Sequence, residues 1–583
     1  MNIKGARFWG YLLALLLMPG GLRAQFTTTT NNGVVVITGY TGPGGSVTIP
    51  GTSNGLPVSV GDFAFYNQAT LTNLTIMAGV VEIGGDAFDT CVNLTSVAIP
   101  GSVTNIGAYA FEYCPSLTNL VISNGVANIA EGAFRLTKLE SISIPGSVTN
   151  IGPSAFEVGS YLESVFLSNG VERIGSNAFF DCGPIHSVFI PASVVSIGVG
   201  AFQDCSFLTN IAVDGSNSNY ASGAGVLFDK TLTTLVEFPG GGNGSLSYVV
   251  PTGVTSIGDS AFALCNLTNI TIPNSVTILG NSAFNGCDQL PSIAIPSSVT
   301  NIGASALSFC LDMTNIVVDS NNPSYASVGG VLFDKTCQTL IRYPAGNTGN
   351  YAISNGVLNI GSEAFESSEL SHVTIPTSVT NVADWAFGYS QLTDVTIPGS
   401  VRNIGSYVFL NCNFLTNVTV LDGVTNIDTW AFAACNELIT VTIPASLRTI
   451  GVFAFDDSPS LTNVFFLGDA PEDGSNTVFT GDPGTVYYLP GTSGWTNAFG
   501  GLPTAVWNPS VQTGNAGFGV MGNQFGFDIN WISGQTVVVE ACTNLSNPVW
   551  LPVQTNTLTG GTAHFTDPQW TNYPGRFYRL QPP

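Results

Sequence analysis

Three histidines, His186, His372 and His564, are the residues of this chain that would most readily act as general bases. A serine hydrolase needs such a base within reach of its nucleophile and a third group that orients it. His186 and His372 instead fall at variable positions of a repeated pattern, and Asp and Glu are scattered singly, without the recurring pair that glycoside hydrolysis uses. We therefore expect no catalytic residue and no enzymatic activity.

Two segments rich in Asp and Asn, 214–219 and 319–322, resemble fragments of calcium-binding loops. Neither has the full ligand spacing, and neither ends in a glutamate that could bind calcium through both oxygens. Turns that Asp and Asn side chains stabilise are the simpler explanation of both segments, and we favour it. The sequence predicts no metal site and no cofactor.

Nine of the eleven cysteines stand three residues after a recurring phenylalanine, and so represent one structural position. Disulfides between neighbouring repeats are one interpretation, and a column of buried free thiols is the other. Parallel strands hold equivalent β carbons about 4.8 Å apart, wider than the about 3.8 Å of a relaxed disulfide, which favours free thiols. The nine are Cys91, Cys114, Cys182, Cys205, Cys265, Cys287, Cys310, Cys412 and Cys435.

An Ala-Phe pair recurs along most of the chain with a step of 22 or 23 residues. A period this short indicates a solenoid, in which each coil buries its apolar face only against its neighbours. Including two variant copies, 306–307 and 408–409, we count fifteen regular coils. The pairs stand at 64–65, 87–88, 110–111, 133–134, 155–156, 178–179, 201–202, 261–262, 283–284, 364–365, 386–387, 431–432 and 454–455.

The coil that starts at Leu267 illustrates the expected local structure. Its segment Leu-Thr-Asn-Ile-Thr-Ile alternates apolar and polar residues, which predicts a half-buried strand with Leu267, Ile270 and Ile272 pointing inward. Pro273 ends the strand. We expect the following Ala283-Phe284 to lie in a short helical turn that fills the core.

The consensus Leu-x-x-Ile-x-Ile-Pro-x-Ser-Val-Thr-x-Ile-Gly-x-x-Ala-Phe-x-x-Cys resembles the BspA-type leucine-rich repeat. The resemblance implies a mainly β leucine-rich repeat solenoid of about 23-residue coils, with a parallel sheet and short helical turns. It also implies adhesion or the binding of host proteins. Two Gly-Val-Leu-Phe-Asp-Lys segments, at 225–230 and 330–335, resemble an insert common in this family, and we expect hairpins near 214–250 and 319–353 that bulge from one edge.

The ends of the chain depart from the repeat. Residues 1–24 combine cations, a short apolar run and Leu-Arg-Ala, as in a secretory signal peptide. We expect a β cap over 25–55, the solenoid over 56–507, and a small all-β module over 510–583, because open solenoid ends expose strand edges and core.

Charge and hydropathy restrict the partners. Without the three cations of residues 1–24, 10 Lys and Arg stand against 37 Asp and Glu, a net charge of −27. Such a polyanion repels nucleic acid. After residue 24 the sequence has no uninterrupted apolar run of about 18 residues, so we expect no integral membrane segment. The interpretation is a monomeric protein that is secreted or held at the cell surface.

The outward positions of the predicted strands are mostly Thr, Ser and Asn. Phe166 and Phe189 replace the small residue on adjacent coils, beside Glu163 and His186, so we expect an exposed aromatic stack at this candidate ligand-binding site. Packing against a neighbouring loop is the alternative. We hypothesise a non-enzymatic binding or adhesion protein for an extracellular protein or glycan, and alternatively a structural spacer or cell-envelope component without a specific ligand.

Overall fold

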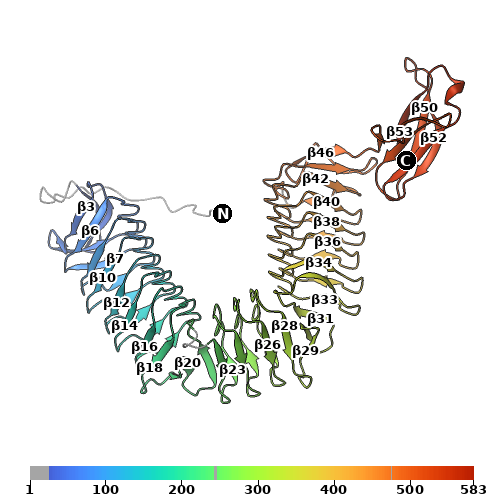
Figure 1. Ribbon diagram of the computed structural model, residues 1–583. Helices are drawn as coiled ribbons and strands as arrows, with labels where there is room; N and C mark the ends of the chain where they lie inside the picture. Colours follow the sequence, from blue (N-terminus) through green and yellow to red (C-terminus); the bar gives the residue numbers. More distant parts are fainter. Residues whose placement is uncertain (1–24, 242–245, 474–475, 583) are drawn as a thin grey trace. The chain divides into compact units, whose positions relative to one another are not determined.

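The computed structural model describes residues 25–241, 246–473 and 476–582. The expected signal peptide, 1–24, lies outside the described residues. Two compact units divide the chain, the first extending to Asn347 and including Phe365–Ser368, the second containing the remainder. Both consist of stacked coils of a mainly β solenoid, about 19 turns in all with almost no helix, which confirms the fold class (Figure 1).

In the first unit, one strand of each coil lies on a shared face, where its apolar side chains alternate inward as predicted. Ile270 and Ile272 are buried, like Leu267 before them. The hydrogen-bonded sheets on this face are short and parallel. Its strands are β3 (Gly45–Ile49), β6 (Leu71–Ile76), β8 (Ser96–Ile99), β10 (Asn119–Ile122), β12 (Ser141–Ile144), β14 (Ser164–Leu167), β16 (Ser187–Ile190), β18 (Asn210–Val213), β22 (Ser247–Val249), β24 (Asn269–Thr271), β26 (Ser292–Ile295) and β28 (Asn315–Val318).

A second face of the first unit carries shorter strands, most of two residues. The longest of its sheets runs in parallel register from β2 (Val34–Tyr40) to β17, for example with Asn128 opposite Asn105 and Asn150. These strands are β5 (Leu56–Val60), β7 (Val80–Ile83), β9 (Asn105–Ile106), β11 (Asn128–Ile129), β13 (Asn150–Ile151), β15 (Arg173–Ile174), β17 (Ser196–Ile197), β23 (Ser256–Ile257), β25 (Ile278–Leu279) and β27 (Asn301–Ile302).

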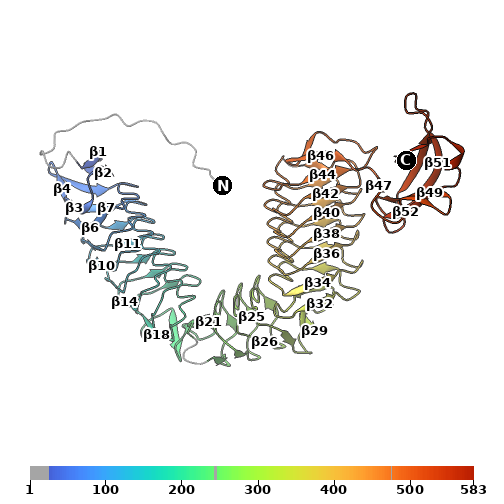
Figure 2. The same cartoon turned by 45° about the horizontal axis from the view of Figure 1, so that its top comes forward.

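The second unit repeats the two faces, and Figure 2 shows its first-face strands following one another. The first face contains β32 (Gly349–Ala352), β34 (Leu370–Thr374), β36 (Asp394–Ile397), β38 (Asn417–Val420), β40 (Thr440–Ile443), β42 (Asn463–Phe466), β44 (Thr485–Tyr488), β45 (Ala498–Phe499) and β46 (Leu502–Val506). The second contains β33 (Asn359–Ile360), β35 (Asn381–Val382), β37 (Asn403–Ile404), β39 (Asn426–Ile427), β41 (Thr449–Ile450) and β43 (Glu472–Asp473).

The Ala-Phe segments form the third side of the coil, and here the expected helical turn is wrong. The described coils contain tight turns in place of helix. The reason is that each regular coil has two residues with left-handed φ values, and these residues are four positions apart, as are Ser282 (52°) and Gly286 (69°). This backbone points alternate amides toward the next coil: Phe284 N donates to Ala306 O at 2.9 Å. The turn side thus adds a third set of hydrogen bonds between coils to those of the two strand faces.

The repeated phenylalanines stack on one another inside the solenoid. From Phe65 to Phe202 successive ring centroids lie 4.8–5.4 Å apart with interplanar angles of 3–18°. Each ring is buried. Such pairs add about 0.5–1.5 kcal/mol beyond the burial of their area, so the core contains a continuous aromatic column.

All eleven cysteines are free in the structure, which agrees with the free-thiol interpretation. The nine repeat cysteines are buried, and each thiol lies against the carbonyl of the phenylalanine that precedes it in the stack, as Cys114 Sγ does at 3.3 Å from Phe88 O. Burial raises the pKa of Cys91 to about 12. The position therefore selects a small side chain that can donate weakly to a carbonyl.

The two inserts do form antiparallel hairpins, but they do not bulge from an edge. Val226, Leu227 and Phe228 are all buried, because the middle strand of the hairpin packs into the stack. The inserts thus replace regular coils. Their strands are β19 (Tyr220–Gly223), β20 (Val226–Asp229) and β21 (Thr234–Glu237) in the first, and β29 (Tyr325–Val328), β30 (Val331–Asp334) and β31 (Thr339–Arg342) in the second.

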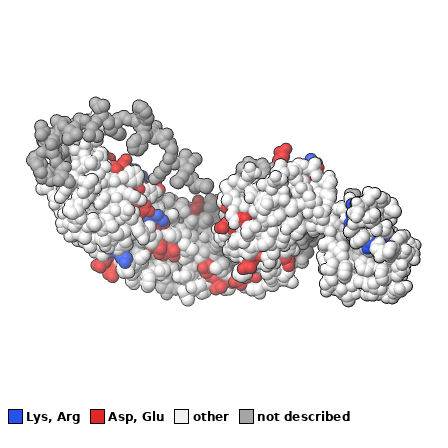
Figure 3. Space-filling view, turned by 90° about the horizontal axis from the view of Figure 1, so that it is seen from above, with Lys and Arg blue, Asp and Glu red and all other residues white. Residues whose placement is uncertain are grey.

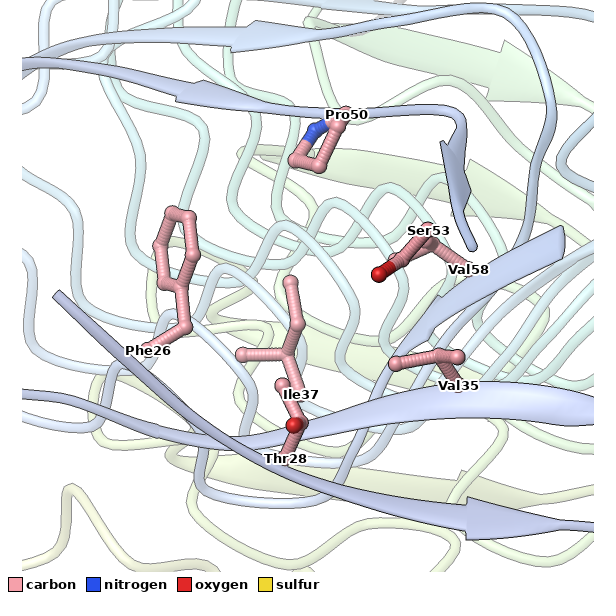
Figure 4. Close-up of a pocket in the computed structure, with 7 residues that line it drawn as sticks. All are labelled: Phe26, Thr28, Val35, Ile37, Pro50, Ser53 and Val58. Atoms are coloured by element: carbon pink, nitrogen blue, oxygen red, sulfur yellow. The ribbon is translucent and has the colours of Figure 1, made fainter. Parts of the chain in front are cut away.

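The N-terminal end of the first unit is closed by an antiparallel hairpin of β1 (Phe26–Asn31) and β2 (Val34–Tyr40), and β4 (Thr52–Ser53) pairs with β5. Phe26, Ile37 and Val58 are among the side chains around a small apolar hollow there (Figure 4). The hollow has no room for more than about one water, so it is a packing defect of the cap and not a ligand site.

The last residues of the second unit form two small antiparallel sheets around Phe527, Ile529 and Phe565. Their elements are β47 (Ser510–Gln512), β48 (Gly519–Met521), β49 (Gln524–Asn530), β50 (Thr536–Cys542), β51 (Leu551–Thr557), β52 (Thr562–Asp567), the 3-10 helix η2 (Trp570–Asn572) and β53 (Phe577–Gln581). Across the described residues no helix is both long and apolar enough to cross a membrane.

Candidate binding surface

The candidate surface lies on the first face of the first unit, where β14 and β16 present alternate side chains to solvent. Phe166 is 63% exposed and Phe189 is 49% exposed, since each stands between two inward-pointing residues of its strand. Glu163 and His186 precede these strands and are also exposed. The structure therefore places all four predicted residues on the outside of adjacent coils.

The expected stacking of Phe166 on Phe189 is absent: their rings make no contact in the structure. The reason is a break in the ladder, because β14 pairs with β12 on one side and β16 pairs with β18 on the other, with no β14–β16 pairing. Without backbone bonds between them, the two strands are not held in the close register that stacking requires. The two rings are separate exposed groups, which also argues against the alternative of packing under a loop.

A ring that the sequence interpretation missed lies next to His186. The centroids of His186 and Phe207 are 6.2 Å apart at 41°, and Phe207 is 54% exposed. His186 Nδ1 lies 2.7 Å from Pro184 O, which fixes the imidazole beside its own turn. Phe207 comes two residues after a repeat cysteine, a position that could have been recognised by aligning the coils there.

Tyr161 occupies the same coil position as Phe207, two coils earlier. Its ring is half exposed, and Lys138 Nζ lies 5.1 Å from the ring centroid, a cation–π contact. We use the name exposed aromatic patch for the exposed rings of three successive coils, of which His186 and Phe207 are the pair in ring contact: Tyr161, Phe166, His186, Phe189 and Phe207.

A second row of aromatic residues, also missed, lies on the turn side of the second unit. Four consecutive coils carry Trp385, Tyr407, Trp430 and Phe453 at the position before Ala-Phe or its variant, all with φ between 58° and 63°. Trp385 stacks on Tyr407 at 4.7 Å, and Trp430 packs against Phe453 at 4.9 Å. Left-handed backbone disfavours bulky residues, so ring stacking must offset a cost at each position.

Charge on the turn side of the first unit is organised across coils. Arg135 bridges Glu112 of the preceding coil (2.8 Å) and Glu157 of the following coil (3.2 Å). Partial burial and acidic neighbours raise the pKa of Asp181 and Asp204. On the face that Figure 3 shows, Asp and Glu form scattered groups and cations are few, so this face is acidic in patches and largely neutral between them.

The other two histidines pair with aspartates. His372 Nε2 lies 2.8 Å from Asp394 Oδ2, and His564 Nδ1 lies 2.5 Å from Asp528 Oδ1. In the part of the chain that the structure describes, no serine, threonine or cysteine is hydrogen-bonded to either imidazole. These pairs therefore resemble the histidine and acid of a triad without a positioned nucleophile.

Residues 51–55 spell Gly-Thr-Ser-Asn-Gly, which fits the Gly-x-Ser-x-Gly pattern of hydrolase nucleophiles. In the structure Ser53 is buried in β4, within a hairpin with β5, where the hydrolase motif requires an exposed strand-to-helix turn. The match therefore has no catalytic geometry.

The two calcium-like segments form turns. Asp214 Oδ1 accepts bonds from Ser216 N and Oγ, and Asp319 Oδ1 accepts from Asn321 N, so these carboxylates stabilise their own backbone. Over 25–241, 246–473 and 476–582, no three His, Cys, Asp or Glu residues gather into a possible metal site.

Comparison with known proteins gives one family. The model of the BspA type leucine rich repeat region (6 copies) matches residues 58–158, 129–240, 243–355 and 342–462. No curated protein matches the chain.

Three solved structures are similar at low identity. A leucine rich cell surface protein from Faecalibacterium prausnitzii is 23% identical, with 78% of this chain and 96% of that chain covered and a TM-score of 0.40. A leucine-rich repeat protein from Bacteroides ovatus is 25% identical, with 76% and 93% covered and a TM-score of 0.38. The pneumococcal vaccine antigen PcpA is 17% identical, with 80% and 92% covered and a TM-score of 0.34.

Proposed function

The chain belongs to the BspA-type leucine-rich repeat family, and on that premise we propose that it is a secreted or cell-surface protein that binds an extracellular protein or glycan. The signal-peptide pattern of residues 1–24 supports export. The binding role is supported by one observation above all, the exposed aromatic patch on a strand face whose other outward residues are mostly small or polar.

The energetics of recognition explain why this patch is the proposed site. Tyr161, Phe166, Phe189 and Phe207 are each about half exposed or more, so a partner could remove a large apolar area from water. Aromatic residues contribute disproportionately to binding free energy. His186 and Glu163, at the same coil position on adjacent coils, add a donor and an acceptor for a polar partner.

The alternative function is a structural spacer, and a specific observation favours it. On the second face the side chains of Asn105, Asn128 and Asn150 bond to one another, with Nδ2 to Oδ1 distances of 2.6 and 2.7 Å. A ladder of this kind uses its hydrogen-bonding groups between coils and leaves fewer for a ligand. It stabilises length and regularity, which are the properties a spacer needs.

The test of the proposal is a binding screen of the purified chain against immobilised extracellular-matrix proteins and a glycan array. Saturable binding to members of one class supports a recognition protein and identifies the kind of partner. No saturable binding in either panel, with a correctly folded chain by circular dichroism, contradicts the proposal and favours the spacer.

Two double variants then locate the site. Phe166→Ala/Phe189→Ala tests the exposed aromatic patch, and Tyr407→Ala/Trp430→Ala tests the aromatic row of the second unit. Leu545→Ala/Val549→Ala, which removes comparable exposed apolar area from the C-terminal module, is the matched control. Loss of binding in the first variant alone supports the proposed site, whereas loss in the second alone would assign binding to the other row.

A further inference from the structure

On the turn side, a side chain and not a backbone carbonyl makes the hydrogen bond between the seventh Ala-Phe coil and the first insert. We call this contact the first joint and the equivalent contact at the second insert the second joint. In a regular coil the amide of the repeat phenylalanine donates to the alanine carbonyl of the next coil, as Phe179 N does to Ala201 O at 2.8 Å. The next coil after Phe202 is the insert, which has Glu237-Phe238 where a regular coil has Ala-Phe. Phe202 N donates instead to Glu237 Oε1, also at 2.8 Å.

Glu237 lies in an apolar environment at the end of β21. The residue is 3% exposed, and the adjacent Phe238 packs against Phe262 at 5.1 Å. The titratable groups that interact with its carboxyl are the buried thiols Cys205 and Cys265. Within the described ranges, no lysine, arginine or histidine forms an ion pair with it, and burial raises the pKa of Glu237 to about 8.

At the second insert a different side chain occupies the equivalent position. Arg342 takes the position of Glu237 and is also buried. Its Nη1 lies 3.7 Å from Glu366 Oε2 and 3.2 Å from Ser308 Oγ, and its Nη2 donates to Glu366 O. The second joint therefore contains a charge pair, whereas the first contains a carboxyl without a cationic partner.

We propose that protonation controls the contact between the coil of Phe202 and the first insert at this joint. The neutral carboxyl of Glu237 stabilises the closed contact, and ionisation of the carboxyl weakens it. A neutral carboxyl can still accept from Phe202 N through its carbonyl oxygen, so protonation costs no hydrogen bond. An ionised carboxylate at the same place must be desolvated without a counter-charge.

The sign of the effect follows from linkage. The carboxyl has a higher pKa in the closed joint than in an opened one, where it returns to its ordinary acidic range. The closed joint therefore binds the proton more tightly, and its stability is greatest at acidic pH, declines as pH rises toward about 8, and changes little above that value. Opening should rise roughly tenfold per pH unit over the interval in which only the opened form is ionised.

The buried thiols beside Glu237 provide the measurement. Cys205 and Cys265 would be labelled with a pyridyl disulfide between pH 5.5 and 9 and quantified by mass spectrometry of their peptides. The rate of Cys205 is divided by that of Cys412 in the same molecule, because both thiols need thiolate formation and only Cys205 adjoins the joint, whereas Cys412 is buried beside Ser390. We expect this ratio to rise roughly tenfold per pH unit up to about pH 8 and then to level off.

Glu237→Gln is the decisive variant, since it keeps an acceptor for Phe202 N and cannot ionise. Its labelling ratio should be independent of pH, and Glu237→Ala, which leaves Phe202 N without this acceptor, should be labelled faster at every pH. Cys310, beside Arg342 in the second joint, is the internal control and should show no rise relative to Cys412.

Equal pH profiles for the wild type and Glu237→Gln would overturn the proposal. If Glu237→Gln does not fold, hydrogen exchange of the wild-type peptides spanning 198–241, corrected for intrinsic exchange, decides instead. Protection of those peptides that is independent of pH between 5.5 and 8 would likewise overturn it.

Discussion

Replacement of Asn217 by aspartate should loosen the first insert, because this buried amide uses its entire hydrogen-bonding capacity. Its Nδ2 donates to Pro191 O at 2.9 Å and Val194 O at 3.0 Å, and its Oδ1 accepts from Asn219 N and Tyr220 N at 2.8 Å. The amide thereby ties the start of the insert to the preceding coil.

Aspartate has the same shape but no donors, so its second oxygen would face two carbonyl oxygens. Two hydrogen bonds at about 1 kcal/mol each are lost, and carbonyls without partners add to this, so we expect a cost of about 2–4 kcal/mol. At the lower figure, opening of the insert increases roughly 30-fold.

The pH dependence of this variant distinguishes the mechanism. The carbonyls disfavour the charged form, so the pKa of the new carboxyl is raised in the folded state. Its destabilising effect is therefore least below the ordinary aspartate pKa of about 3.9 and increases as pH rises above it. Asn217→Ala, which removes all four bonds, should destabilise at least as much without this pH dependence.

Hydrogen exchange of peptides within 214–237 measures the opening directly and does not assume that the whole solenoid unfolds in one step. Asn322→Asp provides the matched comparison, since Asn322 makes the equivalent four bonds in the second insert. Ser218→Ala, at an exposed neighbour, is the control. A change of less than threefold at pH 7 in Asn217→Asp would refute the reasoning.

Three further outcomes are expected. Phe134→Ala should lower the free energy of unfolding by about 3–5 kcal/mol in a denaturant titration, while the exposed Phe166→Ala should change it by less than about 0.5 kcal/mol; similar values for the two would contradict the aromatic column. Burial raises the pKa of Asp482 to about 7, so the wild type should lose stability as pH rises from the acid range to about 7. Asp482→Asn keeps an acceptor for Ser458 N but cannot ionise, so its stability relative to the wild type should increase over that range. Identical dependence of the melting temperature on pH in the two proteins would count against this. Thiol titration without reductant should find eleven reactive thiols in denaturant and almost none of the nine repeat thiols in the native chain, whereas a deficit of two or more in denaturant would indicate disulfides.

The sequence predicted the features that depend on the repeated pattern. Alternation placed Ile270 inward, and the geometry of parallel strands favoured free thiols at positions such as Cys114, because both follow from strand periodicity and spacing. The resemblance of the consensus to the BspA-type repeat agrees with the family match.

The errors arose where tertiary contacts decide the backbone. The left-handed φ of Trp385 could not be anticipated from its type, because tryptophan is disfavoured there and only the stacked turns impose it. The separation of Phe166 from Phe189 depends on a break in the hydrogen-bonded ladder between β14 and β16. The residue types of the two coils do not predict this break. The insert was expected to form a hairpin that bulges from one edge, yet Phe228 is buried in the core that a regular coil would have filled.

The central claim, that the exposed aromatic patch binds an extracellular partner, is tested most directly by titrating the partner found in the screen against the wild type, Phe166→Ala/Phe189→Ala and Leu545→Ala/Val549→Ala by calorimetry. We predict a dissociation constant at least tenfold higher for the Phe166/Phe189 variant, a loss of about 1.4 kcal/mol or more, and an unchanged value for the Leu545/Val549 variant. Equal dissociation constants for all three proteins would contradict the claim.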